Sequence, residues 1–428
     1  SDGTYTLGAA TTLNVNSVQV SHLTDLVFDP DTNRSVVVYV DGNNSNQVTA
    51  QVVQSTGTSG SPTVTAGADS IIDAGDGATE LCACYDTENN KVFVAYDNST
   101  DGETKGIIGT VTGGGTNTIA FTGNATIWNP SGNPSNFDIE FDGDNNKAFF
   151  FYRDEDSGDD LTYKILTLGA SSFSVADGAV LSANDNRLNS GAASFGTGKG
   201  VLVGLYDTGN SAKVSYATVY YGTTTTYTKT NSQYIGKALS ATALELKDQD
   251  PNTLYGQSEG AIAKGKPVIV EADGDFAEVA IDSQTTNYTY SKGTEVELKA
   301  TNIKDTVQSC YDANVDRFVV TYTDGDNANI GRAIVVTTSG TTPSVTATGS
   351  FDASAWGGEN SQPVYDSVNK KVVIIYQAGN DSNKGESIVA TVAESAITFG
   401  TSVQYNTSSQ GGSGDRRSYF DEENEKIV

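Results

Sequence analysis

One short sequence pattern recurs along the chain and constrains its fold more than any other feature. In its clearest copy, the aromatic residue Tyr85 and an Asp lead into a polar turn, a Lys follows, and an apolar run ends at Tyr96. The run is rich in β-branched and aromatic residues and is too short for a helix, so it predicts a strand. Asp and Asn favour the preceding turn because their side chains accept hydrogen bonds from nearby backbone amides. Each copy is therefore predicted to be a β-hairpin.

The copies are regularly spaced. The aromatic residues that begin them are Phe28, Tyr85, Phe141, Phe195, Tyr311, Tyr365 and Phe420. Successive distances between them are 57, 56, 54, 116, 54 and 55 residues. A second polar turn, a third strand and a closing fourth segment follow most copies, which gives four strands per unit. Such a repeat is typical of the blades of a β-propeller. An elongated β-solenoid or an array of small sandwiches is the alternative.

The predicted fold is all-β: a β-propeller of about seven four-stranded blades, with a repeat of about 55 residues and a small inserted β-domain. The 116-residue step marks the insert. The predicted division is 1–14 as the terminal strand of a closing or preceding blade, 15–232 as blades one to four, 233–297 as an inserted small β-domain or a degenerate blade, 298–412 as blades five and six, and 413–428 as the start of a further, truncated blade. The two ends could share a blade, although one middle strand would be missing.

The charge balance argues against two classes of partner. The chain has 53 acidic and 25 basic residues, a formal net charge of −28. Nucleic-acid binding needs a basic surface, and anionic membrane surfaces attract basic segments. No apolar run approaches the length that spans a membrane. We therefore predict no nucleic acid as partner and no membrane insertion.

The three cysteines are predicted to be structural. Cys84 and Cys310 immediately precede the Tyr-Asp of their copies, so both occupy the same place on a first strand. A free Cys in a packed interior behaves as a small apolar residue. One disulfide between Cys310 and either Cys82 or Cys84 is left open by the sequence.

The first turn of the repeat offers a candidate calcium site. Oxygen-bearing side chains stand at alternate positions, best at Asp142, Asp144 and Asn146, and the acidic second turn 154–160 is an alternative site. Carboxylate and amide oxygens at such spacing can surround Ca²⁺. The turns lack the Gly and the distal Glu of an EF-hand, and a basic residue often follows. A turn closed by its own Asp explains every copy without a cation, so calcium stays the one cofactor candidate.

Two tryptophans occupy matching places late in their repeats, Trp128 and Trp356. They would either pack between blades or form an aromatic platform for a sugar ring. Catalytic signatures are missing. The chain has one histidine, no Gly-x-Ser-x-Gly, and no phosphate or dinucleotide loop. We therefore predict a protein that is not an enzyme, although a pair of carboxylates for glycoside hydrolysis stays open because acidic residues are abundant.

The repeat resembles repeats in tail-fibre-like and other virion-surface proteins of marine bacteriophages, cyanophages especially. Residues 383–392 are the closest copy of its second turn and third strand, and 235–242 and 265–270 look like the small β-module that accompanies such repeats. The resemblance covers most of the chain and transfers no site residue. It implies a virion-surface or extracellular protein that serves host attachment or assembly.

The partners that this resemblance implies are other virion or fibre subunits in an oligomer, and a host-surface glycan or protein. Two further functions stay open at this point. One is an extracellular adhesin or fibre-forming subunit of a marine microbe. The other is a carbohydrate-active enzyme on a propeller scaffold.

Overall fold

The computed structural model divides into two compact units, one made of residues 1–219 and 291–428 and the other of residues 220–290. The described residues are 13, 24–58, 61–73, 77–98, 100–128, 135–158, 160–183, 192–207, 211–228, 236–240, 243–246, 253–254, 262, 268–270, 276–278, 283–299, 302–339, 342–354, 357–406, 418–422 and 425–428. The predicted terminal strand 1–14 lies outside them apart from Leu13.

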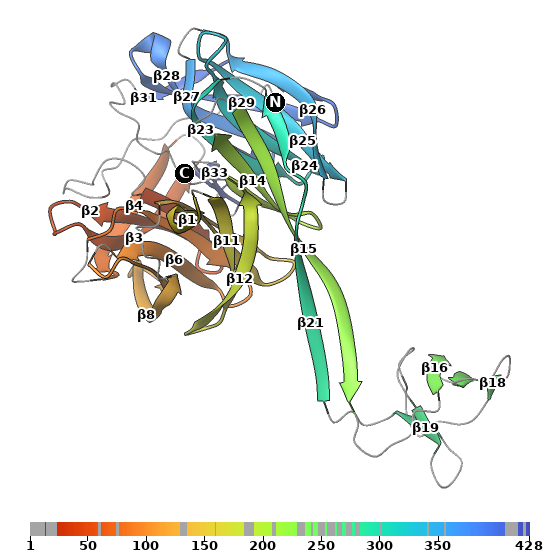
Figure 1. Ribbon diagram of the computed structural model, residues 1–428. Coiled ribbons are helices and arrows are strands. Elements are labelled where there is room, and N and C mark those ends of the chain that lie inside the picture. The colour runs from red at the N-terminus through yellow and green to blue at the C-terminus, as the bar shows by residue number, and fades with distance from the viewer. Residues whose placement is uncertain are drawn as a thin grey trace. The chain divides into compact units, whose positions relative to one another are not determined.

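The first half of the larger unit consists of antiparallel sheets whose strands follow one another in chain order (Figure 1). The first sheet is β1 (Thr24–Asp29), β2 (Arg34–Asp41), β3 (Gln47–Thr58) and β4 (Ser61–Ile71). The second is β5 (Leu81–Asp86), β6 (Lys91–Asn98), β7 (Glu103–Thr112) and β8 (Thr118–Trp128). The third is β9 (Ser135–Asp142), β10 (Lys147–Asp154), β11 (Asp160–Leu168) and β12 (Phe173–Ser182).

The fourth sheet is interrupted after its third strand. It contains β13 (Ala193–Gly196), β14 (Gly200–Asp207) and β15 (Ser211–Thr228). Both β21 (Ser283–Lys292) and β22 (Val296–Lys299) pair with β15. The smaller unit begins within β15 and ends within β21, and it holds β16 (Gly236–Ser240), β17 (Ala243–Leu246) and β18 (Thr253–Leu254) in one sheet and β19 (Val268–Val270) and β20 (Phe276–Glu278) in another.

The pattern of four strands resumes in the last part of the chain. The fifth sheet is β23 (Ile303–Asp312), β24 (Arg317–Asp324), β25 (Ile330–Ser339) and β26 (Thr342–Asp352). The sixth is β27 (Gly357–Asp366), β28 (Lys371–Ala378) and β29 (Lys384–Ala393), with β30 (Ala396–Phe399) and β31 (Val403–Asn406) both on β29. A hairpin of β32 (Phe420–Asp421) and β33 (Lys426–Ile427) follows.

Helix is confined to two single turns in the described part of the chain, η1 (Glu155–Ser157) and η2 (Gly379–Asp381). Among the described residues no helix is long and apolar enough to cross a membrane.

The sheets of the larger unit form a β-propeller arrangement. Contacts join the first strands of successive sheets in the order β1, β5, β9, β13, β23, β27 and β32. Such contacts are expected where four-stranded blades stand around one axis with their first strands innermost. The prediction of an all-β propeller with four-stranded blades is confirmed.

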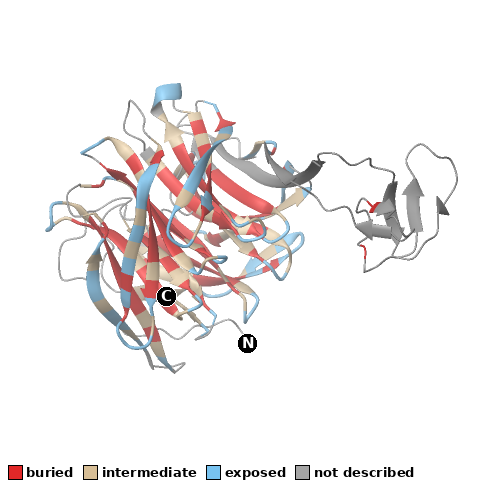
Figure 2. Ribbon diagram, turned by 90° about the horizontal axis from the view of Figure 1, so that it is seen from below, coloured by how far each residue is buried: buried red, intermediate tan, exposed pale blue. Residues whose placement is uncertain are grey.

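The core lies between neighbouring sheets, because a strand presents alternate residues to opposite faces. Ala83 belongs to the apolar cluster shared with the first sheet, and Cys84 belongs to the cluster shared with the third. Second strands are buried on both sides, as in the consecutive residues Val92, Phe93 and Val94 of β6, each 0% exposed. The buried residues accordingly follow the strands of this unit (Figure 2).

The C-terminal hairpin contacts both the sixth sheet and the first. The rings of Tyr419 and Phe28 stack with centroids 4.9 Å apart, and the Tyr419 hydroxyl bonds to the Ser35 hydroxyl. On the other side, Gln362 of β27 donates from Nε2 to the Ser418 carbonyl at 3.3 Å and accepts from the Ser418 hydroxyl at 3.0 Å. These contacts connect the last sheet of the chain to the first.

Candidate functional site

The first turn is closed by its own Asp in the first, second, third, fifth and sixth sheets, whereas the fourth has Gly196 at this position. In the third sheet, the Oδ1 atom of Asp142 accepts hydrogen bonds from the backbone amides of Asp144 at 3.1 Å and Asn145 at 3.2 Å, and Oδ2 accepts from the Asn145 side chain at 2.6 Å. Burial is the main cause that raises the pKa of Asp142. Asp86 and Asp366 make the same three bonds in the second and sixth sheets.

The other two calcium candidates have structural partners or positions of their own. The Oδ2 atom of Asp144 accepts a hydrogen bond from the amide of Gly198, which lies in the first turn of the next sheet. Asn146 is in the left-handed region at φ 53°, a conformation that Asn tolerates better than most residues. The described residues include no group of three or more His, Cys, Asp or Glu side chains that could hold a metal ion. Calcium at these three residues stays a prediction.

Trp128 ends β8 and packs between blades. Its ring centroid lies 4.4 Å from that of Tyr152 on β10, and it borders the apolar cluster between the second and third sheets. This contact favours packing over a free platform for a sugar. Trp356 lies outside the described residues.

The three cysteines are free, with Cys82 and Cys84 buried and Cys310 partly buried. The prediction that they serve as structural thiols agrees with their place in the apolar clusters. Burial is the main cause that raises the pKa of Cys84 and of Cys310 above the usual thiol range, which disfavours the reactive thiolate.

The structure reveals a group of inner carboxylates that the sequence analysis missed. The Oδ2 atom of Asp25 on β1 accepts a hydrogen bond from the Ala83 amide on β5 at 2.7 Å. Asp138 on β9 does the same for the Ala193 amide on β13, also at 2.7 Å. Both aspartates stand three residues before the aromatic residue that begins their copy. Extending the repeat by three residues toward the N-terminus would have shown the shared position.

These hydrogen bonds provide acceptors for backbone amides at the edges of the sheets. A first strand has a sheet partner on one side only, so its other row of amides needs a different acceptor when it is buried. The other oxygen of each Asp accepts from its own strand, from the Leu26 amide at 2.8 Å and the Ile139 amide at 3.0 Å. Each carboxylate therefore links two neighbouring first strands.

Glu140 is the third inner carboxylate. Its Oε1 atom accepts a hydrogen bond from the Phe195 amide on β13 at 3.1 Å. Burial, followed by the negative charge of Asp138 and smaller effects of Asp25 and Asp142, raises the pKa of Glu140 to about 8. Near neutral pH this side chain therefore exists largely as the acid, which can donate a proton.

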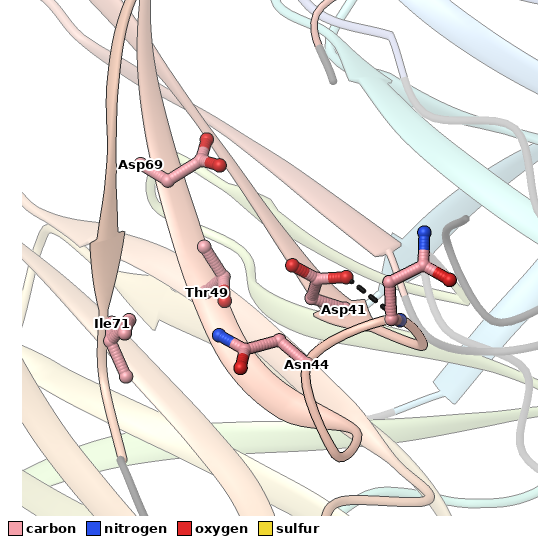
Figure 3. Close-up of a pocket in the computed structure, with 6 residues that line it drawn as sticks. Asp41, Asn44, Thr49, Asp69 and Ile71 are labelled. Atoms are coloured by element: carbon pink, nitrogen blue, oxygen red, sulfur yellow. Dashed lines mark hydrogen bonds between the residues drawn. The ribbon is translucent and has the colours of Figure 1, made fainter. Parts of the chain in front are cut away.

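A polar pocket opens at the other end of the first sheet (Figure 3). Its volume is about 320 Å³, and its lining is Asp41, Asn43, Asn44, Thr49, Asp69 and Ile71. Asp41 is 4% exposed, and its Oδ1 atom accepts from the Asn43 amide at 3.0 Å. Asp69 accepts from the Tyr39 hydroxyl at 2.9 Å. Ile71, at 49% exposure, adds an apolar wall.

Comparison with known proteins gives structural likenesses only. No model of a protein family matches the chain, and no curated protein matches it. The C-terminal WD40 domain of Sif2 is 10% identical over 99% of this chain and 95% of that one, with a TM-score of 0.40. A lectin of Aleuria aurantia with a six-bladed β-propeller fold is 8% identical over 92% and 100%, with a TM-score of 0.36. A PL25 ulvan lyase is 9% identical over 93% and 88%, with a TM-score of 0.39. The function of this chain has to come from its own residues.

Proposed function

We propose that this chain is a non-enzymatic structural and adhesion protein of a virion surface or tail, which contributes to host attachment or assembly. The observation that carries the proposal is that carboxylates of the chain bond to its own backbone. The side chains of Asp25, Asp138 and Asp142 all accept hydrogen bonds from backbone amides and so join strands or close turns. Side chains committed in this way support a rigid scaffold rather than a catalytic centre.

We also infer a propeller of seven blades with an inserted domain. Support for seven comes from the run of contacts between first strands, which ends at the C-terminal hairpin. Support for an insert comes from the fourth sheet. Its third strand, β15, continues into the smaller unit, and β22, which follows that unit in the chain, pairs with β15. A module placed between the third and fourth strands of one blade leaves the rest of the scaffold unbroken and provides a surface for other subunits or a host receptor.

Electron microscopy of native particles, labelled with an antibody against this chain, tests the proposed function. We expect the label at a capsid or tail. A label on free filaments would instead assign the chain to an extracellular fibre or adhesin of a microbe. A lone monomer with no attached particle would contradict both assembly roles.

One observation favours a second candidate, a carbohydrate-active enzyme. Glu140, with its pKa of about 8, neighbours the carboxylates of Asp138 and Asp25 closely enough that both raise that pKa. A protonated carboxyl beside an ionised one is the pair that glycoside hydrolysis uses. The test is a screen of the wild-type protein and Glu140→Gln on marine polysaccharides. Cleavage by the wild type that the variant loses would favour the enzyme.

A further inference from the structure

The pocket of the first sheet occupies a position where the fifth sheet holds a positive charge of its own. The repeat makes the positions comparable. Thr49 pairs across the sheet with Tyr39, the Tyr that closes the second-strand pattern, and Arg332 pairs in the same way with Tyr322 in the fifth sheet. Asp41 and Asp324 each follow that Tyr by two residues.

In the fifth sheet, the side chain of Arg332 fills this position. Its Nε atom lies 3.3 Å from Oδ2 of Asp324, and its Nη1 atom donates to the Ser350 hydroxyl at 2.7 Å. Ser350 pairs with Arg332 as Ile71 pairs with Thr49. The guanidinium therefore lies between the acid at the end of the second strand and the facing fourth strand, which are the walls of the pocket in the first sheet.

In the third sheet, an ion pair neutralises the Asp that corresponds to Asp69 of the pocket. Asp177 of β12 pairs with Lys164 of β11, as Asp69 pairs with Gln51 in the first sheet. The Lys164 ammonium lies 2.6 Å from Oδ1 of Asp177. This ion pair lowers the pKa of Asp177.

The first sheet has both acids and neither cation. Thr49 stands where the fifth sheet has Arg332, and Gln51 stands where the third sheet has Lys164. Arg34 is the only Lys or Arg among the first 90 residues. It begins β2 while Asp41 ends it, about 23 Å away along an extended strand. Its guanidinium is bonded there to Asn117, Thr32 and Asn33.

Asp41 also has an unused oxygen. The side chain is nine-tenths buried, and among the described residues its only side-chain hydrogen bond is the one that Oδ1 accepts from Asn43. The second oxygen, Oδ2, is not among the fully buried side-chain atoms that lack a partner, so it is accessible from the pocket that Asp41 lines. Figure 3 shows the Asp41 and Asp69 carboxylates bordering the same hollow, with Thr49 between them.

We propose that this pocket binds a guanidinium group, as presented by an arginine side chain of a partner protein. The planar guanidinium can donate to both carboxylates at once, which a compact ammonium does less well. Its aliphatic stem would pack on Ile71, and Asn43 and Asn44 at the rim offer hydrogen bonds to a peptide backbone. The inference is independent of whether the chain belongs to a virion.

The direct test measures binding of N-acetyl-arginine N-methylamide by ligand-observed NMR at low ionic strength. We expect a dissociation constant on the order of 1 mM, the range of a small ligand in one polar pocket. The neutral citrulline analogue should bind at least ten times more weakly. Methylguanidinium serves as a second probe. Weaker binding of this ion than of the arginine amide points to a polypeptide source, and equal binding points to a small guanidinium compound.

Variants make the test specific to this pocket, because the acidic surface attracts cations in general. Thr49→Arg should fill the pocket with an internal guanidinium, as Arg332 does in the fifth sheet, and weaken binding at least tenfold. Thr63→Arg, which adds the same charge at an exposed position of β4 outside the pocket, should bind like the wild type. Asp41→Asn removes a negative charge without adding volume and should also weaken binding at least tenfold.

Three results would overturn the proposal. One is equal binding of the arginine and citrulline amides, which would remove charge as the basis of recognition. Another is unchanged binding in folded Thr49→Arg and Asp41→Asn, which would place the ligand elsewhere. Displacement of the arginine amide by millimolar CaCl₂ but not by equal ionic strength of NaCl would also contradict it, since the site would then be a metal site.

Discussion

At the scale of single residues, the carboxylates of the turns and first strands act mainly as hydrogen-bond acceptors for backbone amides. Asp142 closes a turn with three hydrogen bonds, and Asp138 spans from its own strand to the next sheet. Hydrogen bonds to a charged acceptor contribute about 1.5–3 kcal/mol each in favourable cases. Part of the negative charge of this chain, which has 53 acidic residues, therefore stabilises the fold through hydrogen bonds from the backbone.

The turn of the third sheet gives the first prediction. Asp142→Ala removes the acceptor for two backbone amides and one side-chain amide, so we expect the free energy of unfolding to fall by about 2–3 kcal/mol. Urea denaturation measures the change. Asp142→Asn, which keeps one acceptor oxygen, should lose clearly less.

The same turn also allows a test of the predicted calcium site. Since the Asp142 oxygens already accept these bonds, we expect that chelation with EDTA leaves the melting temperature of the wild type unchanged. A fall in melting temperature that calcium restores, and that Asp144→Asn abolishes, would instead establish the predicted site at Asp142, Asp144 and Asn146.

Glu140 gives a prediction about pH. Its pKa is raised from 4.5 to about 8 in the folded protein, so between these values the folded state holds a proton that the unfolded state has lost. Stability therefore falls as pH rises through this window. The side chain is partly exposed, so solvent screening limits its share to about 2 kcal/mol. Glu140→Gln keeps the acceptor for Phe195 and should flatten the fall, as measured by urea denaturation at pH 5 and pH 8. A variant with the wild-type slope would assign the pH dependence to other groups.

At the scale of the elements, the hairpins could be predicted and the contacts between sheets could not. Turn residues and the β-branched run lie within about a dozen positions, so local pattern specifies them. The bond from Asp138 to Ala193 joins residues 55 positions apart, and the one from Asp25 to Ala83 joins residues 58 apart. Such contacts depend on how successive blades stack, which strand periodicity does not contain.

The pocket can be recognised only by comparing equivalent positions in different sheets. Thr49 and Gln51 stand where the fifth sheet has Arg332 and the third has Lys164, and only the register between strands shows which residues are equivalent. Trp128 was found from its matching place in the repeat, but its contact with Tyr152 depends on the neighbouring blade. Candidate residues on turns were thus predictable, whereas those between sheets were not.

The carboxylate links between first strands make a prediction at this scale. Asp138→Ala leaves the Ala193 amide on a buried edge without its acceptor, which should cost about 1–3 kcal/mol of folding free energy. Hydrogen exchange of the β13 amides should speed up more than exchange in β10, which has sheet partners on both sides. Asp138→Asn, with one oxygen retained, is the matched control. Equal exchange rates in the wild type and Asp138→Ala would show that the link does not hold the two strands together.

At the scale of the whole propeller unit, cohesion depends on joining the last sheet to the first. An array of stacked blades that stops short leaves one face of its first sheet uncovered, and here the C-terminal hairpin covers it. Phe28 of β1 stacks on Tyr419, while Gln362 of β27 holds Ser418 from the other side. The hairpin is small, so a few side chains carry this junction.

Tyr419 is therefore expected to matter more than its place beside a two-residue strand suggests. Tyr419→Ala removes the ring that covers Phe28 and the hydroxyl bonded to Ser35, and we expect a loss of about 3–5 kcal/mol in unfolding free energy. Tyr419→Phe keeps the stacking and should lose only about 1 kcal/mol. Hydrogen exchange should quicken in β1 and β27 together in Tyr419→Ala, because both sheets border the opened junction. If β1 alone responded, the hairpin would be a cover for the first sheet and not the element that joins it to the sixth.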